Sequence, residues 1–221
     1  RAGFWMHVSE VLLFLNILPH SKHFHIITAI PNVFLSDTTP PGRIRPIEDI
    51  EGKVERGEPI GVSQIQHLSW KAVLDLYTCT ECGRCTDNCP AHLTGKLLSP
   101  KNLTLDLRDH LYGREAEALD GAGGLQPIEL VPIAIKPEVL WACTTCRACE
   151  TQCPVFISYV DKIVAMRQSL VLEKSEFPQE LAGAFRGMET NGNPWNLSAM
   201  DRASWAEGLD VPRIADKPEA E

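Results

Sequence analysis

The sequence is poor in positive charge and lacks the short motifs of the common nucleotide-binding sites. Lysine and arginine number 21 against 29 aspartates and glutamates, which gives a net charge of −8. No basic patch is large enough to follow a phosphate backbone, so nucleic acid is excluded as the main partner. Neither G-x-G-x-x-G nor a P-loop is present, so nucleotide or flavin binding has to come from elsewhere.

Two further absences limit the fold and the chemistry. No segment shows the alternation of a pairing strand, and apolar residues recur at helical spacing instead. No serine or cysteine is set up as a nucleophile beside a base, because all 8 cysteines fall in one repeated spacing. The 221 residues, 44% of them hydrophobic, suffice for one or two globular domains. The sequence therefore predicts a mainly α-helical protein that contains no complete substrate site.

The cysteines form two copies of C-x2-C-x2-C-x3-C-P, at 79–90 and 143–154. Steps of three residues place three thiolates around one [4Fe–4S] cube. The fourth cysteine lies too far round to close the same cube easily, and in two-cluster ferredoxins it ligates the other cluster. The spacing therefore predicts two [4Fe–4S] clusters with crossed ligands. One is expected on Cys79, Cys82, Cys85 and Cys153, and the other on Cys143, Cys146, Cys149 and Cys89.

Two structural zinc sites are the alternative use of eight thiolates. Zinc is usually held by paired C-x2-C knuckles, so three consecutive steps followed by Cys-Pro favour clusters. The same steps argue against disulfides, and reduced thiols indicate the cytoplasm. Arg84 and Arg147 lie inside the two loops, where we expect their charge to raise the cluster potentials.

The N-terminal segment is apolar and rich in histidine. Phe4–Leu18 is about fifteen residues, shorter than the roughly 20 of a full span, so we interpret it as the end of a transmembrane helix. Because the chain opens on Arg1 with no leader, we expect a slice of a longer protein. The cations that follow the segment predict, by the positive-inside rule, an inner-membrane protein whose remaining part faces the cytoplasm. An amphipathic core helix is the alternative, which Glu10 in mid-segment supports.

The run from Thr78 to Val155 resembles the C subunit of heterodisulfide reductase and the iron–sulfur subunit of glycolate oxidase. Leu140–Cys146 and Asn191–Trp195 look typical of that group. The resemblance implies a helical ferredoxin domain like that of the succinate dehydrogenase iron–sulfur subunit. In larger members cysteine-rich CCG domains follow; this chain contains no CCG motif, so such a domain is an expected partner.

The N-terminus is similar to the last membrane helix of the cytochrome b (gamma) subunit of respiratory nitrate reductase. The similarity rests on His7, on Pro19–Lys22 and on His25. In that subunit two histidines eighteen residues apart bind two b hemes, which implies His7 and His25 as ligands of heme b in the full-length protein. On one helix this spacing is five turns, about 27 Å, so the rings would share a face near opposite sides of a bilayer, with a kink at Pro19.

Together the resemblances imply a membrane-bound iron–sulfur oxidoreductase that takes electrons from electron-transfer flavoprotein and reduces menaquinone. We expect electrons to pass from a cytoplasmic donor through the two clusters towards heme b in a cytochrome b part. A soluble relay subunit of a heterodisulfide reductase-like complex is the alternative, with Phe4–Leu18 as a docking helix. The expected segments are the end of a transmembrane cytochrome b-like segment (1–35), a linker (36–64), the helical ferredoxin domain (65–172) and a C-terminal helical extension with an acidic tail (173–221).

Overall fold

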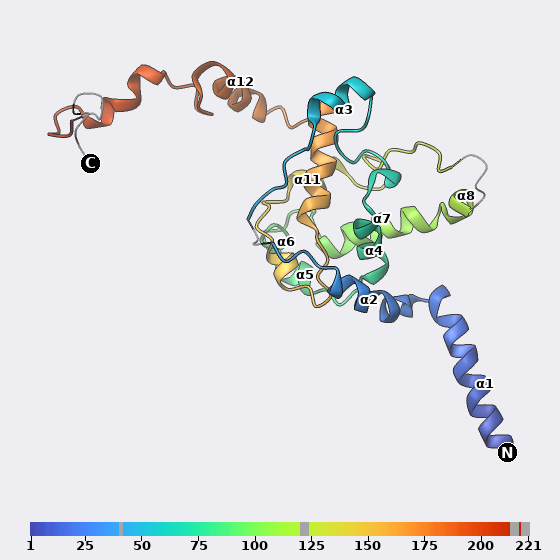
Figure 1. The fold of residues 1–221 in the computed structure, drawn as a ribbon. Helices are drawn as coiled ribbons and strands as arrows, with labels where there is room; N and C mark the ends of the chain where they lie inside the picture. Colours follow the sequence, from blue (N-terminus) through green and yellow to red (C-terminus); the bar gives the residue numbers. More distant parts are fainter. Residues whose placement is uncertain (40–41, 120–123, 213–216, 218–221) are drawn as a thin grey trace. The chain divides into compact units, whose positions relative to one another are not determined.

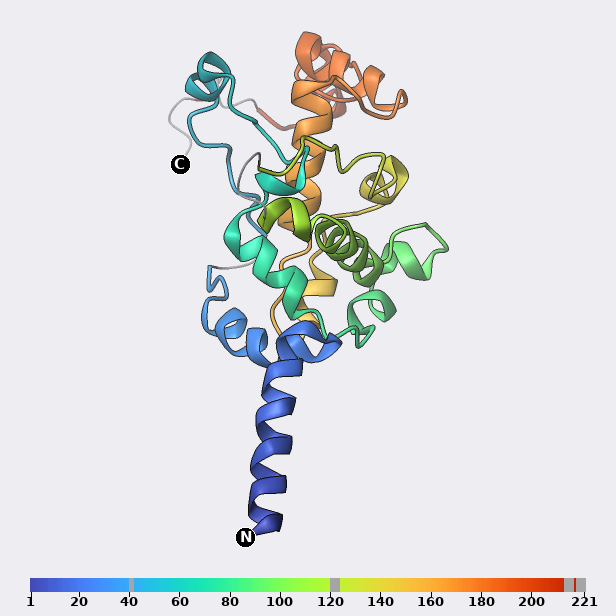
Figure 2. The ribbon, with the colours of Figure 1, turned by 90° about the vertical axis from the view of Figure 1, so that its right-hand side faces the viewer.

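The computed structural model describes residues 1–39, 42–119, 124–212 and 217 (Figures 1 and 2). Within these residues no strand forms, which agrees with the predicted mainly helical class. An isolated bridge pairs Gln64 with Glu129.

The chain divides into two compact units, 1–176 and 177–221. The second unit contains helix α12 (Leu181–Asn191) and the 3₁₀ helix Ala199–Ala206. Of the predicted acidic tail, residues 213–216 and 218–221 lie outside the described residues. The four segments expected from the sequence stay a prediction.

Three helices of the first unit begin at a proline. Helices α6 (Pro90–Leu93), α7 (Pro100–Tyr112) and α9 (Pro137–Trp141) each begin at a residue that has no N–H to leave unpaired in the first turn. Ser99 also caps α7 by accepting the Asn102 N–H. The other α-helices of the unit are α1 (Ala2–Ile17), α2 (His25–Phe34), α3 (Ile50–Arg56), α4 (Trp70–Thr78), α5 (Arg84–Asp87), α8 (Glu115–Leu119), α10 (Ala148–Thr151) and α11 (Val160–Gln168).

Helix α4 contacts both α2 and α7, and leads directly into the first cysteine loop. Leucines from successive segments fill the space around it: Leu76, Leu103, Leu107 and Leu140 are almost completely buried. Burying one such side chain contributes about 1.5–3 kcal/mol relative to exposure. The core therefore holds the segments before and after each cysteine loop against one another.

One buried ion pair joins the two halves of the cysteine repeat. Asp75 on α4 and Lys162 on α11 are 1% and 5% exposed, and their side chains form a salt bridge. Asp75 also accepts bonds from the Lys71 ammonium, 2.7 Å away, and from the Ser158 N–H at 3.2 Å. The carboxylate is thus fully partnered, as a buried charge requires.

The segment expected as an extended linker, 36–64, is more structured than that expectation. It contains α3, which Asp49 caps by accepting the Gly52 N–H. Further on, Gly61 passes so close to α11 that a Cβ there would overlap backbone atoms of Ala165 and Ser169. The segment is therefore fixed to α11, because a glycine at this point allows the two backbones to touch.

The expectation of a single helix from His7 to His25 is wrong. Helix α1 ends at Ile17, and two 3₁₀ turns separate it from α2, which begins at His25. Pro19 lacks the N–H that would continue the α-helix, and Ser21 is extended and caps the next turn by accepting the His23 N–H. His7 and His25 consequently lie on different helices, and their shared face is lost.

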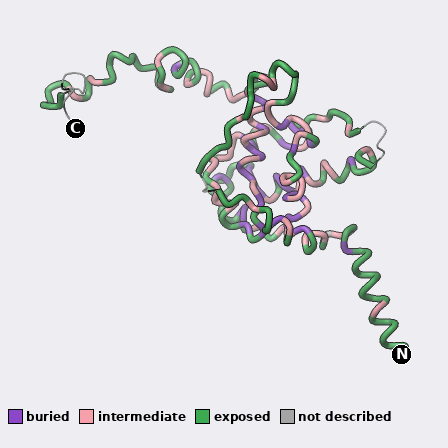
Figure 3. The backbone as a smooth tube through the Cα atoms, viewed as in Figure 1, coloured by how far each residue is buried: buried purple, intermediate pink, exposed green. Residues whose placement is uncertain are grey.

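The two N-terminal helices expose apolar side chains. Ala2–His20, with a mean hydropathy of 1.3, is a helical stretch of 19 residues that is long and apolar enough to cross a membrane, longer than the fifteen residues expected from the sequence. None of the residues in α1 is buried (Figure 3). Helix α2 has an inverted polarity: its buried residues are Thr28 and Asn32, whereas Ile30 and Phe34 are 75% and 86% exposed.

We expect Asp75→Asn to destabilise the first unit by about 3–5 kcal/mol, because Lys162 would keep its charge while losing its buried partner. Burial alone raises the pKa of Asp75, but the Lys162 and Lys71 charges outweigh it and hold that pKa below its ordinary value. The carboxylate therefore stabilises the fold above about pH 4, and this contribution is lost as the pH falls through the folded pKa.

Urea unfolding followed by circular dichroism between pH 7 and pH 3 measures both effects. The matched control is Asp109→Asn, at a side chain that is 71% exposed and pairs weakly with Arg108. Equal stability of the two variants would show that the buried pair does not hold the halves together.

Candidate iron–sulfur centre

The two cysteine loops have the same backbone. Each has a left-handed residue at the third position of the repeat, Glu81 and Thr145, both with φ of 57°. Each has another at the fifth position, Gly83 (φ 85°) and Arg147 (φ 59°). These turns direct N–H groups towards sulfur: the Thr145 N–H donates to Cys143 Sγ at 3.4 Å. The loops thus have the shape expected of chain that wraps a cluster.

The eight thiols fall into two groups, and each loop contributes to both. A cavity is lined by the sulfur-bearing residues Cys143, Cys146 and Cys149 together with Cys89 from the other loop. The name "site 2" is used below for these four cysteines.

"Site 1" denotes Cys79, Cys82, Cys85 and Cys153. The Cys153 thiol lies close enough to Cys79 and Cys85 to influence the pKa of both. The structure therefore places Cys153 near the first loop and Cys89 near the second, and the assignment of ligands to two [4Fe–4S] clusters stays a prediction. Among the described residues no three His, Cys, Asp or Glu side chains lie close enough to hold a single metal ion.

Burial determines the protonation of the inner thiols. It raises the pKa of Cys79, Cys85 and Cys143, and neighbouring thiols raise it further. The pKa of Cys149 is raised most among them, by burial first and then by the Glu150 carboxylate. Cluster ligation needs thiolates, so assembly must release protons from these buried groups.

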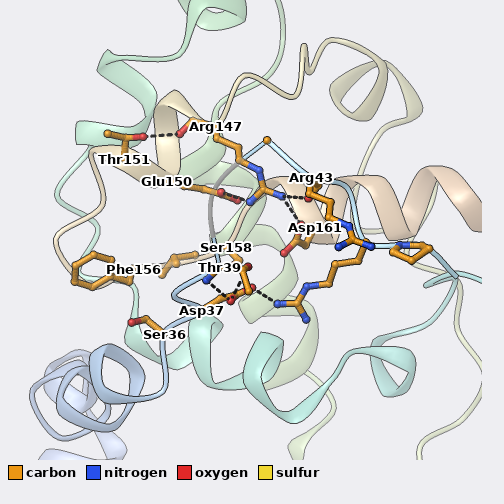
Figure 4. Close-up of a pocket in the computed structure, with 14 residues that line it drawn as sticks. Ser36, Asp37, Thr39, Arg43, Arg147, Glu150, Thr151, Phe156, Ser158 and Asp161 are labelled. Atoms are coloured by element: carbon orange, nitrogen blue, oxygen red, sulfur yellow. Dashed lines mark hydrogen bonds and ion pairs between the residues drawn. The ribbon is translucent and has the colours of Figure 1, made fainter. Parts of the chain in front are cut away.

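Arg147 fixes the second loop to its surroundings. Its guanidinium pairs with Glu150 at 2.7 Å and with Asp161 at 2.8 Å, and it also reaches the carbonyl of Arg43 (Figure 4). The two carboxylates offset part of its charge, and the expected effect of Arg147 on the cluster potential stays a prediction.

These side chains line one wall of an open pocket of about 1010 Å³, between residues 36–39 and 42–46 on one side and the start of α11 on the other. Across the pocket Asp37 has a pKa of about 2, because the Thr39 N–H and hydroxyl and Arg45 stabilise its charged form. Most ionisable groups here are therefore paired with one another, and the pairs of Arg147 connect the second loop to the start of α11.

Helix α2 lies against site 1. Ala29 packs on the buried group that contains Cys79, Cys85 and Cys153 of site 1 together with Cys149 of site 2. The Asn32 amide donates to the Val155 carbonyl at 2.8 Å, and the Thr28 hydroxyl donates to the carbonyl of Tyr77. The polar residues of α2 thus bind the ferredoxin part, which explains why they face inward. His25 begins this helix, and its ring lies 6.3 Å from that of His23.

Several residues near the thiols were not predicted from the sequence. The Tyr159 and Thr86 side chains lie near Cys85 and counter part of the increase in its pKa that burial causes. The Arg167 guanidinium donates to the Cys143 carbonyl at 2.6 Å and lies 5.1 Å from the Trp141 ring. These contacts come from distant parts of the chain, and no local spacing signals them.

Residues 78–157 match the family described as 4Fe-4S dicluster domain. The chain thus contains a dicluster domain, and its relatives are iron–sulfur oxidoreductases. No solved structure matches it.

Three relatives illustrate the kinds of protein to which this chain is similar. "Probable iron-sulfur-binding oxidoreductase FadF" of Bacillus subtilis is 35% identical over 97% of this chain and 35% of its own length. "EtfAB:quinone oxidoreductase" of Syntrophomonas wolfei is 36% identical over 98% of this chain and 32% of its own. "Probable membrane-anchored ferredoxin" of Chromohalobacter salexigens is 35% identical over 74% and 26%. Heterodisulfide reductase subunits C and D are also related. The chain spans about a third of the length of the first two relatives.

We expect the two exposed cysteines, Cys82 and Cys146, to be alkylated first when the cluster-free chain meets iodoacetamide at neutral pH. The thiols of Cys79, Cys85 and Cys149, whose pKa values burial raises, should react more slowly because alkylation requires the thiolate. Peptide mass spectrometry over time gives the order. Early labelling of Cys149, the thiol whose pKa is raised most among the inner cysteines, would contradict this arrangement.

Proposed function

We propose that this chain carries electrons through two [4Fe–4S] clusters within a membrane-anchored oxidoreductase. The observation that carries the proposal is the exchange of the fourth thiol, which gives each group four cysteines from two loops. A [4Fe–4S] cluster supplies one-electron transfer when bound. Cys79, Cys82, Cys85 and Cys153 would hold the first cluster, and Cys143, Cys146, Cys149 and Cys89 the second.

The chain's own residues shield the two sites and set their environment. Four of the inner cysteines, Cys79, Cys85, Cys149 and Cys153, pack with the apolar side chains of Val155 and Ile157 in a single buried group. Burial excludes water, and backbone N–H groups directed at sulfur stabilise negative charge there. The contact between the sites through this shared group supports transfer of an electron from one to the other.

The N-terminal helices support a location at the membrane. A helix apolar on all sides and exposed along its length, as α1 is, is stable in lipid rather than in water. The inverted polarity of α2 fits the same boundary, with Thr28 and Asn32 on the ferredoxin part and Ile30 and Phe34 facing outward. Site 1, which α2 covers, would then be the site nearer the bilayer.

The route beyond the clusters is proposed from the resemblances and the relatives. A relative named "EtfAB:quinone oxidoreductase" supports electron-transfer flavoprotein as the cytoplasmic donor and a quinone, which we propose to be menaquinone, as the acceptor. We propose that His7 and His25 bind heme b between site 1 and the quinone, in a cytochrome b part of the full-length protein at the inner membrane. CCG domains are further proposed partners. A soluble heterodisulfide reductase-like relay is the second candidate, supported by the related subunits C and D.

The ligand assignment predicts which serine variants act on the same cluster. Cys153→Ser and Cys82→Ser should remove the same electron paramagnetic resonance signal, that of the first cluster. Cys89→Ser and Cys146→Ser should both remove the signal of the second cluster. Each variant should retain about half of the iron and acid-labile sulfide, because one four-iron cluster remains. If Cys89→Ser and Cys82→Ser abolished the same signal, the crossed assignment would be wrong. Colourless protein with zinc and no labile sulfide would establish the zinc alternative.

The heme proposal predicts a b-type band in the reduced-minus-oxidised optical spectrum of the full-length protein in detergent. His25→Ala should weaken the band because an axial ligand is lost. His23→Ala is the matched control, two residues away and exposed. A spectrum that shows only broad iron–sulfur bleaching would favour the soluble relay and leave α1 as an anchor or docking helix.

A further inference from the structure

The chain after the last cysteine of the repeat takes a different course in the two copies. After Cys89 it forms α6, where the Leu93 N–H donates to the Cys89 carbonyl at 2.9 Å. After Cys153 the chain turns instead, and the Ile157 N–H, at the same position of the repeat, donates to the Cys153 sulfur at 3.4 Å. A backbone N–H directed at a ligand sulfur stabilises negative charge there. The N–H at this position thus serves the sulfur in the second copy and the backbone in the first.

The turn after Cys153 depends on an unusual backbone at Phe156. Its φ is 55°, in the left-handed region that a phenylalanine rarely adopts. The preceding carbonyl, that of Val155, accepts the Asn32 amide of α2 at 2.8 Å in a buried contact. In the first copy the corresponding carbonyl, that of Ala91, accepts a local backbone N–H at 3.0 Å. The second copy thus replaces a local bond with one from a helix 123 residues earlier in the chain.

The burial of Asn32 costs free energy that packing does not return. The residue is 0% exposed, yet its Oδ1 has no hydrogen-bond partner in the part of the chain that the structure describes. A buried polar atom left without a partner destabilises the folded state. The bond that the amide donates to Val155 therefore explains this residue better than a contribution to the core does.

A second residue of α2 holds the chain at the other end of site 1. Thr28 lies one turn before Asn32 and is 5% exposed. Its hydroxyl lies 3.3 Å from the Tyr77 carbonyl and 3.4 Å from the carbonyl of Phe24. The Phe24 ring also packs edge-on against the Tyr77 ring, with 5.6 Å between centroids. Because Tyr77 lies two residues before Cys79, α2 contacts the chain beside both the first and the fourth cysteine assigned to site 1.

We propose that Asn32 is a positioning residue that raises the reduction potential of the site 1 cluster, by fixing the turn that directs the Ile157 N–H to the Cys153 sulfur. Reduction adds one electron, supplied by the donor, and increases the negative charge on the ligand sulfurs. The N–H stabilises that charge and keeps its proton, so no proton is transferred. Without the bond from Asn32, Phe156 relaxes towards an ordinary backbone conformation and this N–H turns away from the sulfur. The inference rests on the proposed function.

The test is a redox titration of Asn32→Leu in the full-length protein, followed by electron paramagnetic resonance. The signal abolished by Cys82→Ser identifies the cluster of site 1. We expect the midpoint of that cluster to fall by about 59 mV, a tenfold change in a one-electron equilibrium, since a hydrogen bond to a charged acceptor is worth about that factor. The midpoint of the site 2 cluster should not move. Asn16→Leu is the matched control, because the Asn16 amide is exposed and donates to the Leu12 carbonyl of its own helix at 2.8 Å.

Full iron content with an unchanged site 1 midpoint, or any shift of the site 2 midpoint, overturns the inference. If Asn32→Leu loses a cluster, Thr28→Val decides, because it keeps the shape of the side chain and removes only a hydroxyl that holds α2 in place. A smaller fall of the site 1 midpoint alone then supports the inference, and an unchanged midpoint overturns it. Failure of the wild type to hold two clusters would refute the proposed function, which is a separate result.

Discussion

Each cysteine loop in this chain lies against one cysteine of the other loop. Cys89 lies with the thiols of the second loop, and Cys153 with those of the first. The rest of the first unit is organised around these contacts. Asp75 and Lys162 join the helices that precede and follow the pair of loops, and the buried leucines fill the space between them. Each group of thiols thus contains cysteines from both halves of the repeat.

The sequence predicts the parts of this arrangement that depend on local chemistry. Cysteine spacing predicts the two groups of thiols, and prolines at Pro100 and Pro137 predict where helices begin, since both signals act within one turn of chain. Gly61 lies in the expected linker, and no local signal indicates its contact with α11, because α11 is about a hundred residues further along the chain. The break between α1 and α2 was visible locally, in Pro19 and Ser21, but the spacing of the histidines suggested a single helix.

Other features follow from contacts between distant segments and were beyond prediction. No local spacing indicates that the Arg167 guanidinium donates to the Cys143 carbonyl. The apolar residues of α2 are readable as a stripe, yet only the structure shows that Thr28 and Asn32 occupy the inner face. Helical periodicity normally places the apolar stripe inside. Because the polar residues of α2 face inward, we interpret this helix as a surface helix of the first unit and not as a core helix.

The two loops reach one shape by different means. At the fifth position the first loop has Gly83, for which a left-handed backbone is unstrained, whereas the second has Arg147. A left-handed arginine costs about 1–2 kcal/mol, which its ion pairs with Glu150 and Asp161 can offset. At this position the first loop relies on glycine, and the second on ion pairs. Salt and acid weaken ion pairs but leave glycine unaffected. Two loops with the same cysteine spacing in one chain can therefore differ in their tolerance of the surrounding solution.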